Sequence, residues 1–538
     1  MKKFNTLGVM IDMSRNAVMS MDGLKRFLPL LRKMGYNCVM LYTEDTYEVE
    51  GEPYFGYLRG RYSKAEMKEI DAFAASLGMT VIPCIQTLAH LNAVFRWKKV
   101  PRDCDDILLT DDERTYELID RMFATLSECF ASRKIHIGMD EAHMLGRGKH
   151  LDRHGYETVN DIMRRHLDRI CKIAEKYNYE LMIWSDMFFR PWNNGTYTIP
   201  KREIPKEVVD SLPQSVIPVY WDYYQSKESV YSDMLENHKQ LSDKIWFAGG
   251  AWCWYGMIPY NRFTLESMIP ALDACRKHRV RDVIFTMWGD DGAECSHFAQ
   301  LPSLFYLAEY AKGNSNEAKI KEKFKRLCGI DYDEFMEIDC PNDVIEYQGS
   351  PRNPSKYMLY SDYFNGFLDY TVKEGGGEIY RTYAEKLHAI AKKSRRYGYV
   401  FDAAAKLCSV LEIKYELGMR TRRAYESGDK AELKRLAENE YVQVEKRINA
   451  YLRAFEKQWM TDNKPHGFDV QHLRLGGLLC RTDACRRRIL DYVNGRLERI
   501  EELEEALLPF ESQEKSIRYN NAPSTATVNL IHHGHVGS

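Results

Sequence analysis

Eight short apolar runs recur along residues 1–312, and amphipathic segments separate them. Each run is rich in aliphatic and aromatic residues, and in the intervening segments apolar residues return at intervals of three and four. Nearly continuous apolar strands that alternate with helices indicate a parallel sheet covered on both faces. The runs lie at 7–13, 38–44, 80–86, 134–141, 180–187, 216–223, 245–252 and 282–289.

Eight strand–helix units in about 310 residues predict a closed (β/α)8 barrel, or TIM barrel, of the α/β class. A doubly wound open sheet is the alternative fold for such a pattern. The GxGxxG pattern that binds dinucleotides in that fold is missing after the first run. Eight regular units therefore favour closure of the sheet.

The strand-like runs stop after residue 312, and long charged segments with helical periodicity follow. The sequence predicts a catalytic barrel over 1–312 and a linker with short helices over 313–356. An all-helical domain is predicted over 357–512. The last residues, 513–538, show no periodicity and predict a flexible tail. The helical domain has enough amphipathic surface for a homodimer, although no sustained heptad pattern marks the face.

Composition restricts the classes of partner. The net charge is −2, so there is no global positive field for nucleic acid or an anionic membrane surface. No run reaches the roughly 18 uncharged apolar residues of a membrane helix. The start, MKKFNTLGVM, lacks the apolar core and cleavage site of a secretory signal. The 13 cysteines are scattered, without a CxxC pair, which favours a reduced cytoplasmic protein without disulfides, metal or cofactor.

Acidic and aromatic residues gather where the predicted strands end. In a TIM barrel the chemistry lies at the carboxyl ends of the strands, because the loops converge there. Five of the nine tryptophans fall at these ends, together with several carboxylates. Aromatic rings can stack on the apolar faces of a sugar while carboxylates hold its hydroxyls. The tryptophans are Trp184, Trp221, Trp252, Trp254 and Trp288.

The most informative feature is the consecutive pair Asp140 and Glu141. Neighbouring residues of a strand point to opposite faces, so two acids inside a buried strand are costly unless the strand ends there. Two adjacent carboxyls also push their pKa values apart, which lets one act as a protonated acid while the other stays ionised. The pair predicts general acid–base chemistry on a carbohydrate.

The run HIGMDEAH at 136–143 resembles the HxGGDE motif of family 20 glycoside hydrolases, the β-N-acetylhexosaminidases. Other segments of the predicted barrel follow the order of the same family. They are the first strand, the segment of His90, Tyr220-x-Asp222 and Trp288-x-Asp290. The chain is most similar to the branch with a helical domain after the barrel and without a small N-terminal α/β domain.

The resemblance implies an exo-acting retaining enzyme that releases terminal GlcNAc or GalNAc. In the family the acetamido oxygen of the substrate attacks the anomeric carbon, and an oxazolinium intermediate forms. Carried over by position, the catalytic residues implied are Glu141 as general acid and then base, Asp140 as the carboxylate that orients the acetamido group, and Tyr220 as the hydrogen-bond partner of the acetamido oxygen. The substrate-binding residues implied are Asp12, His90, Trp184, Asp222, Tyr223, Trp252, Trp254, Trp288 and Asp290.

Three positions depart from the family pattern. Leu7 stands where the family usually has an arginine that binds sugar hydroxyls, so Asp12, Glu44 or Arg15 is expected to compensate. Met139 replaces the second glycine of the motif, and Asp290 stands where glutamate is common. Two other functions stay open: a barrel glycosidase with a carboxylate nucleophile, and a sugar-binding protein without catalysis.

Overall fold

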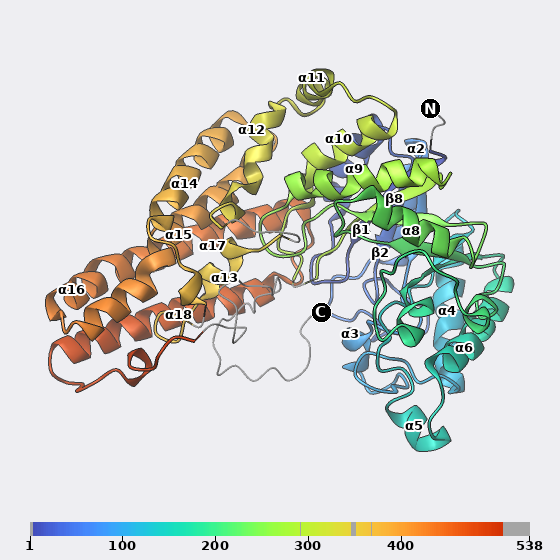
Figure 1. Cartoon of the computed structure of the whole chain (residues 1–538), viewed down its shortest axis with the longest axis horizontal. Coiled ribbons are helices and arrows are strands. Elements are labelled where there is room, and N and C mark those ends of the chain that lie inside the picture. Colours follow the sequence, from blue (N-terminus) through green and yellow to red (C-terminus); the bar gives the residue numbers. More distant parts are fainter. Residues whose placement is uncertain (1–3, 291, 346–350, 367, 509–538) are drawn as a thin grey trace. The chain divides into compact units, whose positions relative to one another are not determined.

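The computed structural model describes residues 4–290, 292–345, 351–366 and 368–508 (Figure 1). The predicted tail at 513–538 lies outside the described residues. The described chain forms two compact units that interleave along the sequence. The first takes the described residues of Met1–Ala251, Phe263–Trp288 and Ser303–Ile320, and the second those of Trp252–Arg262, Gly289–Pro302 and Lys321–Ser538. The domain borders expected from the sequence stay predictions.

The first unit contains a closed barrel of eight parallel strands in sequence order. The last strand pairs with the first, with Thr6 opposite Asp282 and Ile11 opposite Met287. This closure confirms the predicted (β/α)8 fold and excludes the alternative of an open sheet. The strands are β1 (Thr6–Asp12), β2 (Cys38–Tyr42), β3 (Thr80–Cys84), β4 (Lys134–His136), β5 (Glu180–Trp184), β6 (Ile217–Trp221), β7 (Trp246–Gly250) and β8 (Asp282–Met287).

Helices follow the strands, and four of them, α1, α2, α4 and α6, begin with a Ser, Thr or Asp side chain that accepts a backbone N–H of the first turn. Ser63 begins one of them with a complete capping box to Glu66, which satisfies backbone N–H groups that the helix leaves unpaired. The helices of the connections are α1 (Met21–Met34), α2 (Lys64–Ser76), α3 (Asn92–Phe95), α4 (Glu113–Cys129), α5 (Lys149–His154), α6 (Val159–Glu175), α7 (Lys206–Val209), α8 (Glu228–His238), α9 (Asn261–Lys277) and α10 (Leu301–Ala311).

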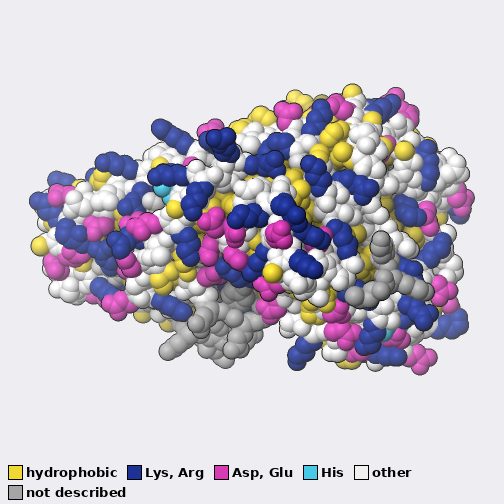
Figure 2. Space-filling model, turned by 90° about the horizontal axis from the view of Figure 1, so that it is seen from above, with side chains coloured by type: hydrophobic (Ala, Val, Ile, Leu, Met, Phe, Trp, Pro, Cys, Tyr) yellow, Lys and Arg dark blue, Asp and Glu magenta, His cyan; other side chains and the backbone are white. Residues whose placement is uncertain are grey.

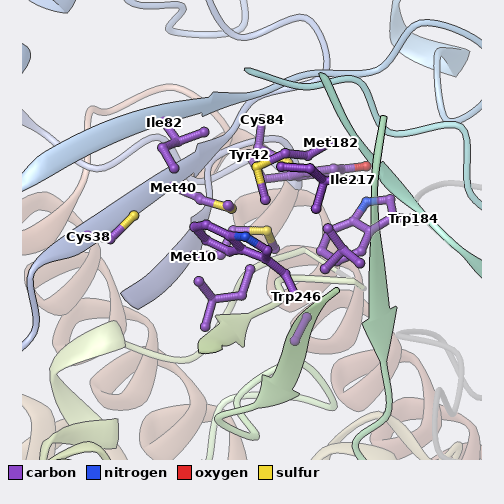
Figure 3. Close-up of a cluster of buried hydrophobic side chains, with 13 residues drawn as sticks. Met10, Cys38, Met40, Tyr42, Ile82, Cys84, Met182, Trp184, Ile217 and Trp246 are labelled. Atoms are coloured by element: carbon purple, nitrogen blue, oxygen red, sulfur yellow. The ribbon is translucent and has the colours of Figure 1, made fainter. Parts of the chain in front are cut away.

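Alternate strand residues fill the barrel interior. Figure 3 shows the side chains of Met10, Met40 and Met182 converging between the strands. Because side chains along a strand alternate between two faces, the inward residues of β6 are Ile217 and Val219, and Tyr220 points to the helix layer. This alternation decides which strand-end residues can reach a site in the barrel mouth.

Within its described residues, the second unit is helical after residue 321, as predicted for the C-terminal region. The long helix α15 (Gly398–Glu426) packs against α14 (Gly376–Lys393) and α17 (Tyr441–Asp462), and in the core of the unit the aromatic rings of Phe335 and Phe401 lie 5.1 Å apart. Its helices are α11 (Glu317–Cys328, which begins in the first unit), α12 (Tyr332–Met336), α13 (Pro354–Tyr360), α14 (Gly376–Lys393), α15 (Gly398–Glu426), α16 (Lys430–Arg435), α17 (Tyr441–Asp462) and α18 (Phe468–Val493).

Charged side chains of both signs are intermixed on the surface. Lys and Arg alternate with Asp and Glu over the face seen in Figure 2, in agreement with a net charge of −2. Within the ranges that the structure describes, no helix is both long and apolar enough to cross a membrane.

Candidate active site

The backbone leaves strand geometry directly after β4. Gly138, Met139 and Glu141 have φ values of 71°, 70° and 50°, in the left-handed region. The chain therefore turns, and Asp140 and Glu141 are not forced onto opposite faces as they would be in a strand. A Cβ on Gly138 would lie 2.0 Å from Gln86 Oε1, so only glycine fits there. Met139 adopts the same left-handed conformation with a buried side chain, at the position where the family motif has glycine.

Asp140 is buried and held by two neighbours. Gln86 Nε2 donates to Asp140 Oδ1 over 2.7 Å, and His90 Nε2 lies 3.3 Å from Asp140 Oδ2. Burial alone would raise the pKa of the Asp140 carboxyl, but the charge of His90 and the hydrogen bonds outweigh it and lower that pKa. Burial disfavours the charged form of His90, yet the Asp140 carboxylate raises the pKa of His90 to about 9. The two groups therefore form an ion pair at neutral pH.

Glu141 has a different environment from its neighbour. Its side chain is 39% exposed, against 12% for that of Asp140. One carboxylate oxygen lies 3.5 Å from Arg190 Nη2 and the other 3.9 Å from His90 Nε2. The backbone N–H of Glu141 donates to Asp186 Oδ2 over 3.0 Å. The backbone is thus fixed while the carboxyl group stays accessible to a ligand.

Asp186 and Arg190 follow β5 and support Glu141. Asp186 is fully buried and accepts hydrogen bonds from Arg190 Nε at 3.2 Å and Trp221 Nε1 at 3.3 Å. Burial raises the pKa of Asp186 to about 7, and the negative charges of Asp140 and Glu141 act in the same direction. Asp186 stands at the end of the fifth predicted strand, but neither residue was among the predicted site residues. Their spacing of four, directly after a strand end, was the only available signal.

Aromatic side chains continue from Asp140 across the barrel interior. Gln86 Nε2, which holds Asp140, also donates to the Tyr42 hydroxyl over 2.9 Å. The ring of Tyr42 lies edge-on to Trp288 with centroids 4.7 Å apart, and the ring of Trp184 lies 5.9 Å from Trp288. Trp184 and Trp288 were predicted site residues, and a chain of contacts connects them to Asp140. Tyr42 and Gln86 were not among the predicted site residues.

Tyr223 belongs to the same aromatic group. Trp288 Nε1 donates to the Tyr223 hydroxyl over 2.9 Å, and the Tyr223 ring stacks on Trp221 with centroids 5.4 Å apart. Tyr223 was predicted as a substrate-binding residue, and it lies beside the predicted Trp288. Its hydroxyl is therefore joined to the interior aromatic side chains.

Tyr220 lies on the opposite face of β6. Its ring packs against His238 and Phe247, with centroids 4.7 and 5.4 Å away, and its hydroxyl donates to Asp222 Oδ2 over 3.1 Å. The structure does not bring Tyr220 to the carboxylate pair. Asp222 is also buried and accepts the backbone N–H of Tyr224 at 3.0 Å. Burial raises the pKa of Asp222 to about 6.

Acidic and basic residues at the end of β1 and directly after β1 and β2 form a second polar group. Asp12 is buried and accepts from the backbone N–H and hydroxyl of Ser14, at 2.8 and 2.7 Å. Arg15 Nη2 lies 3.1 Å from Glu44 Oε1, and the Tyr42 hydroxyl donates to the same oxygen over 3.0 Å. Tyr42 thus connects the Arg15–Glu44 pair to Gln86 and Asp140.

Three predicted residues belong to the second unit. Trp252 and Trp254 are buried there and stack with ring centroids 4.3 Å apart, and Asp290 lies in the same unit. Their predicted contact with substrate stays a prediction. Among the described residues, none of the predicted site residues belongs to a group of three or more metal-ligating side chains.

Comparison with known proteins gives two family matches along the chain. Residues 4–230 match the glycosyl hydrolase family 20 catalytic domain, and residues 331–521 match the glycoside hydrolase 20C C-terminal domain. The chain resembles hexosaminidase D of Bos taurus, with 25% identity over 43% of this chain and 65% of that protein. For hexosaminidase D of Homo sapiens the identity is 25%, over 37% of this chain and 41% of that protein. The alignments thus span from two fifths to just under two thirds of these relatives.

Among the solved structures that this chain resembles is the family 20 exo β-N-acetylglucosaminidase of Vibrio harveyi. It has 15% identity and a TM-score of 0.47, over 61% of this chain and 58% of that one. The assignment rests on the two family matches, which together cover well over half of the sequence in the order barrel, then helical domain. The chain belongs to glycoside hydrolase family 20.

Proposed function

We propose that this protein is an exo-acting, retaining β-N-acetylhexosaminidase that removes terminal GlcNAc or GalNAc by substrate-assisted catalysis. The observation that carries the proposal is the contrast within one carboxylate pair. Asp140 is buried and held ionised by His90, whereas the Glu141 side chain is 39% exposed and its backbone is fixed by Asp186. One group is suited to stabilise a positive charge, and the other to exchange protons with substrate and water.

In the first step the acetamido carbonyl oxygen of the substrate forms a bond to the anomeric carbon. The bond to the leaving oxygen breaks, and Glu141 gives that oxygen its proton. The product is an oxazolinium ion, and Asp140 opposes the positive charge that develops on the acetamido nitrogen. In the second step Glu141 takes a proton from water, whose oxygen attacks the anomeric carbon and reopens the ring. Two displacements at one carbon give net retention.

The aromatic group around Trp184 and Trp288 supports a pocket for the acetamido group. These rings lie within a chain of contacts that ends on Asp140, so an acetamido group against them has its nitrogen near that carboxylate. We assign the hydrogen bond to the acetamido oxygen to Tyr223 and not to Tyr220. The reason is that Tyr223 is joined to Trp288, whereas Tyr220 faces the helix layer.

The Arg15–Glu44 pair supplies the polar contacts that Leu7 cannot make. Both side chains are largely buried, with 12% and 7% exposed, and Tyr42 connects them to the Asp140 network. A guanidinium and a carboxylate side by side can donate to and accept from neighbouring hydroxyls of one sugar. We therefore assign recognition of ring hydroxyls to this pair.

Asp140→Asn is expected to lower kcat about 10²–10³-fold, with little change in KM, because the opposed charge develops mainly in the transition state. The measurement is steady-state kinetics on an aryl β-GlcNAc, together with the inhibition constant of a thiazoline analogue of the intermediate. Asp168→Asn, on the exposed face of α6, is the matched control. If the thiazoline binds the wild-type protein no better than GlcNAc does, the nucleophile must be sought in the protein.

Tyr223→Phe is expected to lower kcat/KM by about 10–100-fold, the effect of losing a hydrogen bond to a group that becomes charged. Tyr220→Phe, at a tyrosine of the same strand region, is the matched comparison. It removes only the bond to Asp222 and is expected to cost about 1 kcal/mol of stability with kcat/KM nearly unchanged. The reverse order of the two effects on kcat/KM would return the role to Tyr220.

The test of the proposed function is a panel of aryl β-glycosides of GlcNAc, GalNAc, glucose and galactose. Hydrolysis of the two acetamido sugars alone supports the proposal. Hydrolysis of all four at similar kcat/KM identifies a conventional barrel glycosidase with a carboxylate nucleophile. Binding of GlcNAc in calorimetry without hydrolysis of any substrate identifies a sugar-binding protein.

A further inference from the structure

Outside the proposed active site, two histidines on the connection between β4 and α6 lie close to an aspartate on the connection between β3 and α4. His150 and His154 are four residues apart on α5, so their rings lie on one face, with centroids 4.6 Å apart. Asp111 directly precedes the N-cap of α4, and its Oδ2 lies 3.9 Å from His150 Nδ1. One ligand atom from each of the three residues lies within 4.8 Å of the other two.

The second nitrogen of His150 fixes which side of its ring can bind a metal. His150 Nε2 lies 2.8 Å from Glu157 Oε2, and Arg165 pairs with the same carboxylate oxygen. An ionised carboxylate only accepts, so Nε2 carries the hydrogen, and neutral His150 has its lone pair on Nδ1, which faces Asp111. Histidine ligands of metals usually donate their other N–H to a carboxylate in this way.

The backbone around His150 is held in place by another residue. Asp103 accepts from the backbone N–H groups of Gly146 and His150, at 2.8 and 2.7 Å. His150 is fully buried, whereas His154 and Asp111 are exposed residues. One ligand is therefore preorganised, and two can adjust to an ion that arrives from solvent.

We propose that Asp111, His150 and His154 bind one divalent transition-metal ion, of which Zn²⁺ fits best. Two imidazole nitrogens and a carboxylate oxygen are ligands that Zn²⁺ prefers, and a water completes a tetrahedral set. Ligand atoms in such a site are about 3.4 Å apart. A small side-chain movement brings His150 Nδ1 and Asp111 Oδ2, now 3.9 Å apart, to this separation. The exposed side chain of His154 makes the larger movement.

Two neighbours compete with the ion. Thr110 Oγ1 lies 3.4 Å from His150 Nδ1, at the outer limit of a hydrogen bond, and Arg165 Nη2 lies 3.7 Å from Asp111 Oδ2. Neither contact is short enough to block a stronger metal–ligand bond. The ion would connect α5 to the start of α4. Helix α5 lies on the β4–α6 connection, and the same connection carries Asp140 and Glu141 at its beginning.

The test measures Zn²⁺ binding by calorimetry on the full chain with His532, His533 and His535 replaced by alanine, because these tail histidines can also bind Zn²⁺. In that background we expect one equivalent. His154→Ala and Asp111→Asn should each abolish it, and Glu157→Gln, which removes the orienting carboxylate, should weaken it about 10–100-fold. His388→Ala, an exposed histidine in the second unit, is the matched control and should bind as the background does.

Hydrogen exchange locates the ion independently of any activity. Zn²⁺ should slow exchange in peptides that cover 149–157 and 110–113 in the background chain, and not in His154→Ala. Both altered ligands are exposed, so the apo variants should keep the melting temperature of the background. Absence of Zn²⁺ binding in the background, binding unchanged in both ligand variants, or protection only elsewhere in the chain would each overturn the proposal.

Discussion

Glu141→Gln is expected to lower kcat by roughly 10²–10⁴-fold on a β-GlcNAc glycoside with a poor leaving group, such as an alkyl alcohol. Such an alcohol departs only if it receives a proton, and the amide of glutamine cannot supply one. On a nitrophenyl or dinitrophenyl glycoside the departure of the leaving group should suffer much less. The measurement is a series of aglycones of rising acidity, in which the variant should depend more steeply on leaving-group pKa than the wild type does.

In the proposed mechanism, the same substitution also removes the base that activates water. For the most reactive aglycones the second step should therefore limit the variant, and a burst of released phenol should precede a slow steady state. Glu207→Gln, at an exposed position on α7, is the matched control and should keep both steps. An equal loss of kcat on all aglycones, without a burst, would show that Glu141 is not the acid.

A β-galactoside should be hydrolysed at least about 10³-fold less efficiently than the β-GalNAc glycoside with the same aglycone, measured as kcat/KM. The reason is that an intramolecular nucleophile held beside the anomeric carbon has an effective concentration of about 10⁵–10⁸ M, and a 2-hydroxyl sugar has no such group. In the proposed mechanism, the surface that would hold the acetamido group is formed by the contacts that run from Trp184 through Trp288 and Tyr42 to Gln86 and Asp140.

Discrimination between GlcNAc and GalNAc is expected to be weaker than discrimination between acetamido sugars and 2-hydroxyl sugars. It depends on one hydroxyl, and Leu7 stands where the family usually has the hydroxyl-binding arginine. Arg15→Lys and Glu44→Gln should therefore change the GlcNAc/GalNAc ratio while the preference over the 2-hydroxyl sugars persists. Similar kcat/KM values for β-GalNAc and β-galactoside would contradict substrate assistance.

The amino-acid sequence alone determined the fold class and the position of the acid pair. Eight apolar runs predict eight buried strands, because a strand that is covered on both faces has apolar side chains at nearly every position. The barrel closes as predicted, and β4 ends before the two acids. Asp140 and Glu141 could be singled out because two consecutive acids inside a buried strand are costly, so the strand must end at the pair.

Only the tertiary structure decided which neighbours surround the pair. Gln86 and Arg190 lie 54 and 49 residues from the carboxylates they contact, and no local pattern connects residues on different strands. The sequence placed Tyr220 in the site by its order along the chain. In the structure Tyr220 points to the helix layer. The preceding residue, Val219, points into the barrel interior, and neighbouring side chains of a strand point to opposite faces.

The same reason explains the cluster on α5. Periodicity shows that His150 and His154 share a helix face, but Asp111 comes from a different connection of the barrel, 39 residues earlier than His150. Sequence spacing determines contacts within one helix or strand, where the repeat is fixed by backbone geometry. Contacts between loops are decided by how the closed barrel brings the ends of its strands together, and that closure exists only in three dimensions.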